Sequence, residues 1–428
     1  SIVSGGNFNT VVGDEAGTAI TTGDLNVAVG YQSGDAINTG ERNVLAGHSA
    51  GGALTSGGSN TAIGDRTLLA DTQGSDSVAI GRNALFAQNF TSATSSYNIA
   101  IGRDAGASIT TGVQNVLIGA LAGDALTTAS RNVAVGYETL STATGFNENT
   151  AVGYRALKAS TDGHSNTSVG VNTLLANTTG HSNVAVGHKA ITACVDGEGN
   201  TAVGFEALLT EDSGSKSTAI GYRALKVQDN AASNHNTAVG YDCLSADTTG
   251  INNTAIGKSA LNSLTTGDNN VGVGVESGAQ GAMINIIGED NRAVFGNNTT
   301  SHSYVKVDWT VTSDQRDKTD ITNFTHGLDY ANKLRPVNYV WDERSNYEDG
   351  IPDGSKKKSE VQLGFLAQEV QAIETGLGID NNAIVDTEFS DSLKMTNAKL
   401  IPVLVNAIQE LSEKNDALES RLAALEAK

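Results

Sequence analysis

The chain has 428 residues, enough for more than one domain, and it carries a net charge of −20. Glycine is abundant with 49 residues, but there are only 3 prolines, which excludes a collagen-like fibre. Hydrophobic residues make up 39% and charged residues 17%, so a disordered chain is not expected. The acidic charge argues against nucleic-acid binding and against anchoring on anionic lipid. No apolar run is long enough to predict a membrane-spanning helix.

A five-residue word, Asn-(Thr/Val)-Ala-(Val/Ile)-Gly, recurs through the first two thirds of the chain. Its glycine occurs sixteen times between Gly13 and Gly274, and thirteen of the fifteen intervals are 17 residues. The alternating β-branched residues predict a short strand, and the glycine predicts a corner after it. A second glycine commonly precedes the Asn by three residues and indicates another turn. The first two thirds are therefore a repeat array.

A 17-residue unit cannot bury an apolar face alone, so successive units must stack as the rungs of a coil. At about 4.8 Å per rung, sixteen rungs make a rod of roughly 75 to 80 Å. An extended fibre is the alternative, but two turns in every unit fit it poorly. We expect the Asn residues to form a hydrogen-bonded ladder. We also expect the fourth residue of the word, as in Val152 and Val169, to face the core. The small core of each rung favours packing of several chains, and we predict a trimer.

Two longer intervals, 83–98 and 224–236, predict loops extruded from the rod, either as tolerated insertions or as recognition loops. Aromatic residues follow the strand glycine in several rungs, where other rungs carry charged residues, so they are expected to be exposed. They are candidate glycan contacts because aromatic rings stack on sugars, although filling a seam between chains is an alternative. These residues are Tyr137, Tyr154, Phe205, Tyr222 and Tyr241.

Neither the cysteines nor the histidines predict a metal site or a cofactor. Cys194 and Cys243 match no zinc or redox spacing and are expected to be buried free thiols. His164 and His181 are one repeat apart, so we expect them to stack as surface residues rather than to bind a metal.

After Gly274 the repeat dissolves, and residues 281–312 are expected to form an irregular β-structured connector that ends in the alternating Val305, Val307, Trp309 and Val311. From residue 313 glycines become rare and helical periodicity appears.

The last segment, about 400–428, has the heptad spacing of a coiled coil. Asn415 is the single polar residue of the seam, and such a residue fixes the register of the helices. Isoleucine at the first and leucine at the second seam position favours two strands, which does not support a trimer. A membrane-surface helix is disfavoured because the seam is narrow. The seam residues are Ile401, Leu404, Ile408, Leu411, Asn415, Leu418, Leu422 and Leu425.

Common enzyme motifs, such as GxSxG, HExxH and the P-loop, are absent from the sequence. The run Ser313-Asp314-Gln315-Arg316-Asp317-Lys318 reads by itself as an N-capped turn. Together with later motifs it resembles the start of the endosialidase-type intramolecular chaperone domain of phage tail fibres and tailspikes. The resemblance covers about residues 313–428, and its further motifs are Ile321, Leu334-Arg335-Pro336-Val337 with Tyr339, Gly364 to Val370, Leu400 to Val403 and Ala407 to Leu411.

The resemblance implies a domain that helps three chains to assemble and then cuts itself off with a Ser–Lys dyad. Ser313 would be the nucleophile, Lys318 the base, and the bond between Thr312 and Ser313 the scissile bond. A lysine can act as a base when burial or a nearby cation such as Arg316 lowers its pKa. The five-residue offset suits neither a helix face nor a strand face, so the chain must bend between the two residues.

The repeats are similar to the head repeats of trimeric autotransporter adhesins, which are stacked left-handed β-rolls. We therefore predict a mainly β, trimeric β-solenoid shaft (1–280), the connector (281–312) and an α+β chaperone domain (313–428). The resemblance implies a phage tail fibre, assembled in the host cytoplasm and carried on the virion. Its expected partners are two further copies of the chain, a host glycan or protein receptor, and other tail proteins. The alternatives are a glycan-degrading tailspike, which needs a carboxylate pair, and a purely structural fibre.

Overall fold

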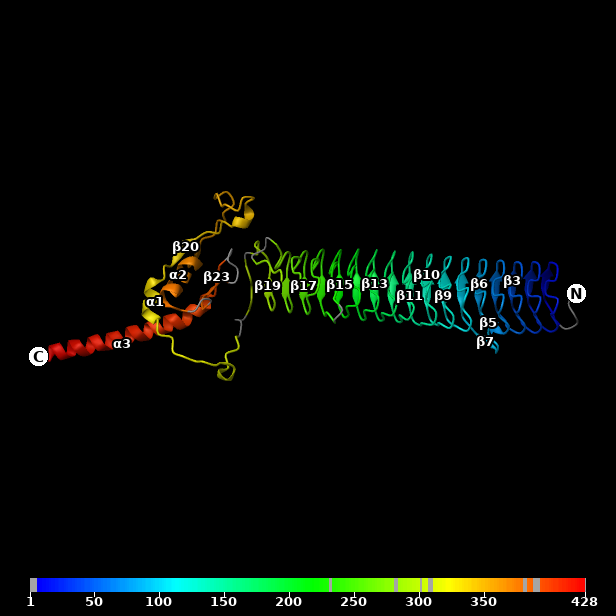
Figure 1. Cartoon of the computed structure of the whole chain (residues 1–428), viewed down its shortest axis with the longest axis horizontal. Coiled ribbons are helices and arrows are strands. Elements are labelled where there is room, and N and C mark those ends of the chain that lie inside the picture. Colours follow the sequence, from blue (N-terminus) through cyan, green and yellow to red (C-terminus); the bar gives the residue numbers. More distant parts are fainter. Residues whose placement is uncertain are drawn as a thin grey trace. The chain divides into compact units, whose positions relative to one another are not determined.

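The computed structural model describes residues 6–230, 233–280, 284–300, 302–306, 311–379, 383–387 and 393–427. The chain divides into two compact units, unit 1 (Ser1–Ser303) and unit 2 (Tyr304–Lys428). Figure 1 shows unit 1 as a row of stacked coils and unit 2 as a small helix-containing body with a long terminal helix.

Unit 1 is a β-solenoid built on one parallel sheet of seventeen strands, in which each strand pairs with the strand of the next rung. Each strand has three residues and pairs in equivalent register, as in Val152 opposite Val169. The fold class predicted from the repeat is confirmed. The strands are β1 (Thr10–Val12), β2 (Val27–Val29), β3 (Val44–Ala46), β4 (Thr61–Ile63), β6 (Val78–Ile80), β8 (Ile99–Ile101), β9 (Val116–Ile118), β10 (Val133–Val135), β11 (Thr150–Val152), β12 (Thr167–Val169), β13 (Val184–Val186), β14 (Thr201–Val203), β15 (Thr218–Ile220), β16 (Thr237–Val239), β17 (Thr254–Ile256), β18 (Val271–Val273) and β19 (Ala293–Phe295).

The last strand, β19, extends the solenoid one rung beyond the array recognised in the sequence. It pairs parallel with β18, with Val271 opposite Ala293. Part of the predicted connector is therefore a rung of the shaft. Residues 302–306 form no strand, and Val307 and Trp309 lie outside the described residues.

The predicted inward face of the strands is wrong. Ala151 and Ser168, the third residues of their words, are fully buried, whereas Val152 and Val169 are partly exposed. The reason is the corner that follows the strand, where Leu157 is fully buried and fills the space behind Ala151. A small residue on the strand and a large one at the corner together fill the narrow core.

Two rungs with a larger residue in the middle of the strand support an effect of volume. Where the third residue of the word is Leu45 or Leu117, the corner position of the same rung is Gly51 or Gly123. A Cβ at Gly123 would lie 2.9 Å from a methyl group of Leu117. Leucine at the corner has a positive φ, 52° at Leu157, which is an unusual conformation for a branched residue. Core filling stabilises that conformation in ten of the sixteen repeats.

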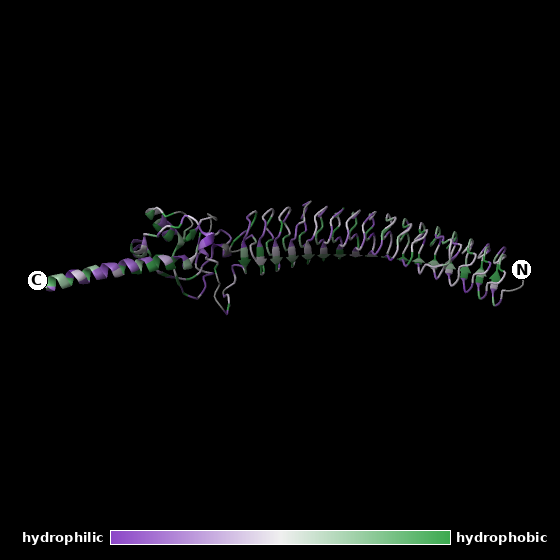
Figure 2. Ribbon diagram, turned by 90° about the horizontal axis from the view of Figure 1, so that it is seen from below, coloured by the Kyte–Doolittle hydropathy of each residue, from purple (hydrophilic) through white to green (hydrophobic). Residues whose placement is uncertain are grey.

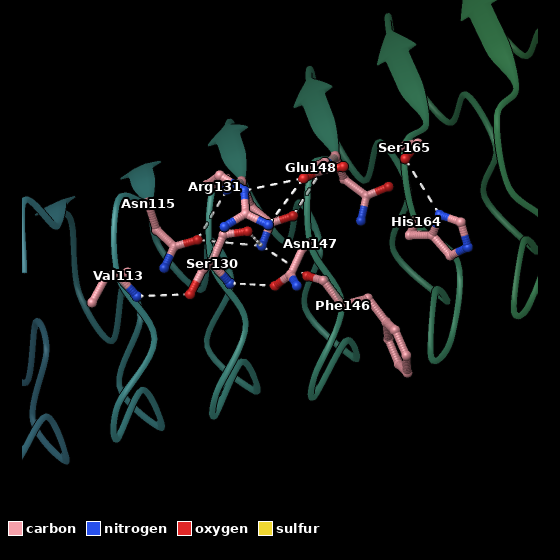
Figure 3. Close-up of polar contacts among 11 residues, drawn as sticks. Val113, Asn115, Ser130, Arg131, Phe146, Asn147, Glu148, His164 and Ser165 are labelled. Carbon is pink, nitrogen blue, oxygen red and sulfur yellow. Dashed lines mark hydrogen bonds and ion pairs between the residues drawn. The ribbon is translucent and has the colours of Figure 1, made fainter.

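The predicted Asn ladder is confirmed. The side-chain oxygen of each ladder Asn accepts the backbone N–H of the Asn one rung further along, at 3.0 Å between Asn115 and Asn132. Its side-chain nitrogen donates to a turn carbonyl of the next rung, as Asn115 does to Ala129 at 2.9 Å. Figure 3 shows this side of the coil, where Arg131 also pairs with Glu148 at 2.9 Å. The buried amides of the ladder are thus hydrogen-bonded between rungs.

The ladder is interrupted in the two rungs where Ser77 and Ser217 replace Asn, and each interruption precedes a longer interval. In the first, Gln88 donates to Ser77 at 2.9 Å and to the buried Asp71 at 2.7 Å, and accepts from Asn98 at 2.9 Å. The extra residues form a loop whose strand β7 (Thr94–Ser95) pairs with β5 (Gly74–Ser75). In the second, Gln228 bonds in the same way to Ser217, Glu211 and Asn236.

Unit 2 contains three α-helices, two antiparallel strand pairs and short 3₁₀ turns among its described residues. Its core includes Tyr330, Val370, Val385, Leu400 and Val403. The elements are η1 (Gln315–Asp317), α1 (Gly327–Lys333), β20 (Val337–Tyr339), η2 (Arg344–Asn346), β21 (Gln362–Gly364), α2 (Ala367–Leu377), β22 (Val385–Asp386), β23 (Lys394–Met395), η3 (Asn397–Lys399) and α3 (Leu400–Glu426), with β20 paired to β21 and β22 to β23.

Helix α3 carries two apolar faces. Leu400, Val403 and Ala407 are buried in unit 2, whereas the predicted heptad seam is exposed, with Ile408 67% and Leu425 66% accessible. Among the residues that the structure describes, the side chain of Asn415 in the seam bonds along its own helix, to Glu419 at 2.9 Å. Among the described residues, no helix combines the length and the apolar composition needed to cross a membrane.

Candidate functional site

The first residues of unit 2 form one tight turn around the predicted dyad. Asp314 caps η1 by accepting the backbone N–H of Arg316 at 2.9 Å, and the backbone N–H of Lys318 bonds to the carbonyl of Gln315. The chain therefore reverses between Ser313 and Lys318, as the five-residue offset predicted. An Asp two residues before its N–H partner is a common way to start such a turn.

This turn brings the two predicted catalytic side chains into contact. Lys318 Nζ lies 2.6 Å from Ser313 Oγ and 3.5 Å from the carbonyl oxygen of Ser313. A hydroxyl and an amine at this distance can exchange a proton, which is the first requirement for a serine nucleophile with a lysine base.

Arg316, which was predicted to act as a nearby cation for Lys318, is itself paired with a carboxylate. Its guanidinium pairs with Asp314 at 2.6 Å, and this hydrogen bond holds the pKa of Asp314 below its usual value. The positive charge of Arg316 is thus matched by a neighbouring carboxylate. Both Ser313 and Lys318 are exposed within the single chain.

Helix α3 fixes the helix that follows the dyad loop. Glu410 of α3 accepts the backbone N–H groups of Gly327 and Leu328, each at 3.0 Å, and so caps the start of α1. Asn406 of α3 donates to the carbonyl of Phe324 at 2.9 Å. The end of the dyad loop is therefore attached to the same helix that presents the exposed seam.

The predicted aromatic residues are exposed, and they stack on one another along the shaft. Ring centroids are 5.8 Å apart for Tyr137 and Tyr154, 5.1 Å for Phe205 and Tyr222, and 5.0 Å for Tyr222 and Tyr241. His188 continues the second column, 5.3 Å from Phe205. The inner rings of this column have a ring against each face, so a ligand meets mainly their edges.

The predicted histidine and cysteine environments are also present. His164 and His181 stack with centroids 4.8 Å apart. Cys194 and Cys243 are buried free thiols, and burial raises the pKa of each to about 12. Across the part of the chain that the structure describes, no group of three His, Cys, Asp or Glu side chains is arranged to hold a metal ion.

Sequence reasoning missed two clusters of charge beside the aromatic rings. Glu138 contacts Arg155 at 2.8 Å and Lys158 at 2.5 Å, and chiefly the hydrogen bond from Lys158 lowers the pKa of Glu138 to about 2. The same arrangement recurs at Glu206 with Arg223 and Lys226. The signal was present in the sequence, because all three residue types recur with an offset of 68 residues, which is four repeats.

Comparison with known proteins identifies the region around the dyad. No curated protein matches the chain. Residues 313–379, which begin at Ser313 and extend past α2, match the family described as chaperone of endosialidase. The C-terminal region that follows the β-solenoid is therefore similar to a chaperone-of-endosialidase domain.

Proposed function

We propose that the protein is a phage tail fibre, in which three β-solenoid shafts bind a host surface and the C-terminal domain assembles the chains and then cuts itself off. The observation that carries the proposal is the contact between Lys318 and Ser313 at the first residue of the chaperone-like region. A self-cleaving domain placed directly after a rigid rod is what a separable assembly domain requires.

Two unpartnered apolar surfaces support association of identical chains. The first is the outer face of the sheet in unit 1, which Figure 2 shows as a row of strands along one side of the coil. The second and fourth residues of the repeated word lie on this face, and from β1 to β18 they are only Thr, Val, Ile and one Ala, with no charged residue. The second is the heptad seam of α3. Apolar surface of this extent is typical of an interface.

The proposed cleavage follows from the geometry of the turn. Ser313 Oγ attacks the carbonyl carbon of Thr312, and its proton passes to the neutral amine of Lys318. The amide bond breaks, the proton returns to the amino group of Ser313, and an ester links Thr312 to Ser313 Oγ. Water then hydrolyses the ester, which leaves a carboxyl group on Thr312 and the free Ser313 hydroxyl and amine.

We further propose that assembly switches on this reaction. General-base catalysis needs an uncharged lysine, and burial favours the uncharged form. Because the dyad is exposed in one chain and α3 anchors the segment that follows it, neighbouring chains joined along α3 would cover the dyad. Cleavage would then follow assembly.

The experiment is a denaturing gel of freshly expressed full-length protein. Wild type should give fragments of 312 and 116 residues, which together make up the 428-residue chain, and Ser313→Ala should stay whole. Asp317→Asn is a matched control in the same turn and should be cut. Cutting of Ser313→Ala at the wild-type rate would overturn the dyad. Light scattering of Ser313→Ala should give the mass of three chains, and a monomer would overturn the proposed assembly.

A further inference from the structure

Two surface clusters on the shaft have the same construction. Each cluster combines two stacked rings on successive rungs with one carboxylate and two cations. Cluster 1 comprises Tyr137, Glu138, Tyr154, Arg155 and Lys158, and cluster 2 comprises Phe205, Glu206, Tyr222, Arg223 and Lys226.

In both clusters the carboxylate lies beneath the cations. The side chains of Glu138 and Glu206 are 15% and 14% exposed, whereas those of Arg155 and Arg223 are 39% and 38% exposed. Each guanidinium also lies over a ring, 5.0 Å from its centroid, at Tyr154 and Tyr222 respectively. One carboxylate cannot neutralise two cations, so each cluster presents a net positive charge on an aromatic base.

The surface between the clusters carries no carboxylate at the equivalent positions. These positions are one, two and five residues after the rung glycine, and in the two intervening rungs they hold Val171, Asn172, Leu175, His188, Lys189 and Thr192. At these three positions, the six rungs that begin at Gly136 and end with the rung of Gly221 carry five cations and two covered carboxylates, in a chain whose net charge is −20. We call this row of positions the strip. A local positive strip on an acidic protein attracts anions specifically to that strip.

The spacing of the two clusters indicates an extended ligand. They are four rungs apart, which is about 19 Å along the shaft at 4.8 Å per rung. A compact ligand contacts one cluster, but a linear polymer with a repeated anionic group can contact both. Two linked contacts on one polymer strengthen binding beyond either alone.

We propose that this strip binds an anionic polysaccharide lying along the shaft, with carboxylate or phosphate groups on the cations of both clusters. Sugar rings contact the exposed edges of the aromatic columns, which suits a ligand with both apolar and polar faces. This inference rests on the proposed receptor-binding function of the shaft and names the chemical class of the receptor. The residues of the strip follow the glycine that ends each strand, so they lie beyond the sheet. The strip is therefore separate from the strand face proposed for chain association.

The test is calorimetric titration of the full-length protein with four polymers. Polygalacturonate supplies carboxylates on sugars, and a glycerol-phosphate teichoic acid supplies phosphates. Dextran is an uncharged polysaccharide, and polyglutamate is an anionic polymer without sugars. Wild type should bind at least one of the two anionic sugar-containing polymers at least tenfold more tightly than dextran or polyglutamate, and which one binds identifies the anionic group. The affinity should fall as salt rises.

The variants locate the binding on the strip. Arg155→Gln and Arg223→Gln should each weaken binding roughly threefold to tenfold, and the double variant by more than either, because both contacts are lost. Arg131→Gln is the matched control, since it removes the same charge from an exposed ion pair without a ring beneath it. Unchanged melting temperatures show that the variants fold.

Several results would overturn the inference. These are equal binding of dextran, tight binding of polyglutamate, no binding of either anionic sugar-containing polymer, or an unchanged affinity in the double variant. None of these results alters the cleavage gel or the trimer mass, which test the assembly and cleavage parts of the proposed function separately. Conversely, an uncut monomer that still binds polygalacturonate through both clusters would overturn those parts and leave this inference in place.

Discussion

The side-chain oxygen of Asn149 accepts the backbone N–H of Asn166 at 3.0 Å, while the Asn149 side-chain nitrogen donates to the carbonyl of Gly163 at 3.0 Å. One buried amide therefore joins two successive rungs and satisfies two backbone groups that water cannot reach. This bond pattern makes the ladder a direct determinant of shaft stability.

Replacing Asn149 with Ala should destabilise the shaft because it leaves the backbone N–H of Asn166 unpaired in the core and leaves the carbonyl of Gly163 with only the longer bond from Ser160, at 3.4 Å. An unpaired buried group costs roughly 1 to 3 kcal/mol. Asn147→Ala is the control, since Asn147 accepts a backbone N–H from Ser130 at 2.7 Å near the surface, where water can replace it. Thermal melting of the two variants should show the larger loss for Asn149→Ala, and equal losses would contradict the role of the buried ladder.

The orientation of the strand can be tested by placing a carboxylate at one or the other of two neighbouring positions. Ala151→Asp places a carboxylate in the core and should cost several kcal/mol, because Ala151 is fully buried. Val152→Asp places it on the partly exposed outer face and should cost much less. Circular dichroism melting distinguishes the two, and a greater loss at Val152 would restore the opposite orientation.

The outer face should affect association rather than folding. Substitution of Ile118, Val152 and Val186 by Asp puts charges on alternate rungs of the proposed interface without placing two on adjacent strands. We expect the strand signal in circular dichroism to persist while shaft-to-shaft association weakens. After cleavage has removed residues 313–428, light scattering should show monomers for the triple variant and trimers for wild type. Trimers that survive all three changes would place the chain interface elsewhere.

Buried carboxylates should make the shaft less stable as the pH rises. Burial is the main cause that raises the pKa of Asp247 from 3.8 to about 7. Below pH 4 both the folded and unfolded chains bind this proton, so Asp247 contributes nothing. Between about pH 4 and pH 7 only the folded chain keeps it, so stability falls progressively, by roughly 4 kcal/mol in total for about three pKa units.

The variant Asp247→Asn should remove this dependence and should melt higher than wild type at pH 8. An Asn is accommodated at the equivalent position of another rung, where Asn177 donates to Gly180 at 3.0 Å. The exposed Asp162→Asn changes the net charge equally and should leave the pH profile of unfolding as it is. A wild-type free energy of unfolding that does not change from pH 4 to pH 8 would contradict a buried acid at Asp247.

A dyad that uses lysine as its base should not accept arginine in that place. Lys318→Arg keeps the positive charge and a donor to Ser313, but an arginine side chain does not deprotonate in proteins. We therefore expect this variant to assemble and remain uncut, whereas a merely structural cation would allow cleavage. The cleavage rate of wild type should also increase with pH. Cleavage of the variant and the pH dependence of the wild-type cleavage rate are read from timed samples on a denaturing gel.

The repeat period was enough to predict the solenoid, the strand positions and the Asn ladder, because hydrogen bonding between rungs requires the same residue at the same place. It was not enough to orient the strand. Ala151 and Val152 are both apolar, so the pattern of apolar and polar residues does not distinguish the two faces. The buried Leu157 decides the orientation through its volume, and that effect appears only once the corner is placed next to the strand.

The dyad was predicted from the resemblance and not from its own six residues, which read by themselves as an N-capped turn. Its two side chains meet because both lie in one short turn. By contrast, the clusters around Glu138 and Glu206 combine residues from two rungs, 17 or more positions apart. Their recurrence after 68 residues is present in the sequence, but the contacts within each cluster follow only from the register of the rungs. The replacement of the ladder Asn by Ser77 is visible in the repeated word, but its compensation by Gln88 was not predicted.

The equivalent register of neighbouring rungs makes the length of the shaft a discrete quantity. Removing any 17-residue unit from one strand glycine to the next, such as 154–170, joins two corners of the same geometry and leaves the Asn ladder unbroken. The rod should then shorten by one step of about 4.8 Å. The length of the shaft can therefore be changed in steps of one rung.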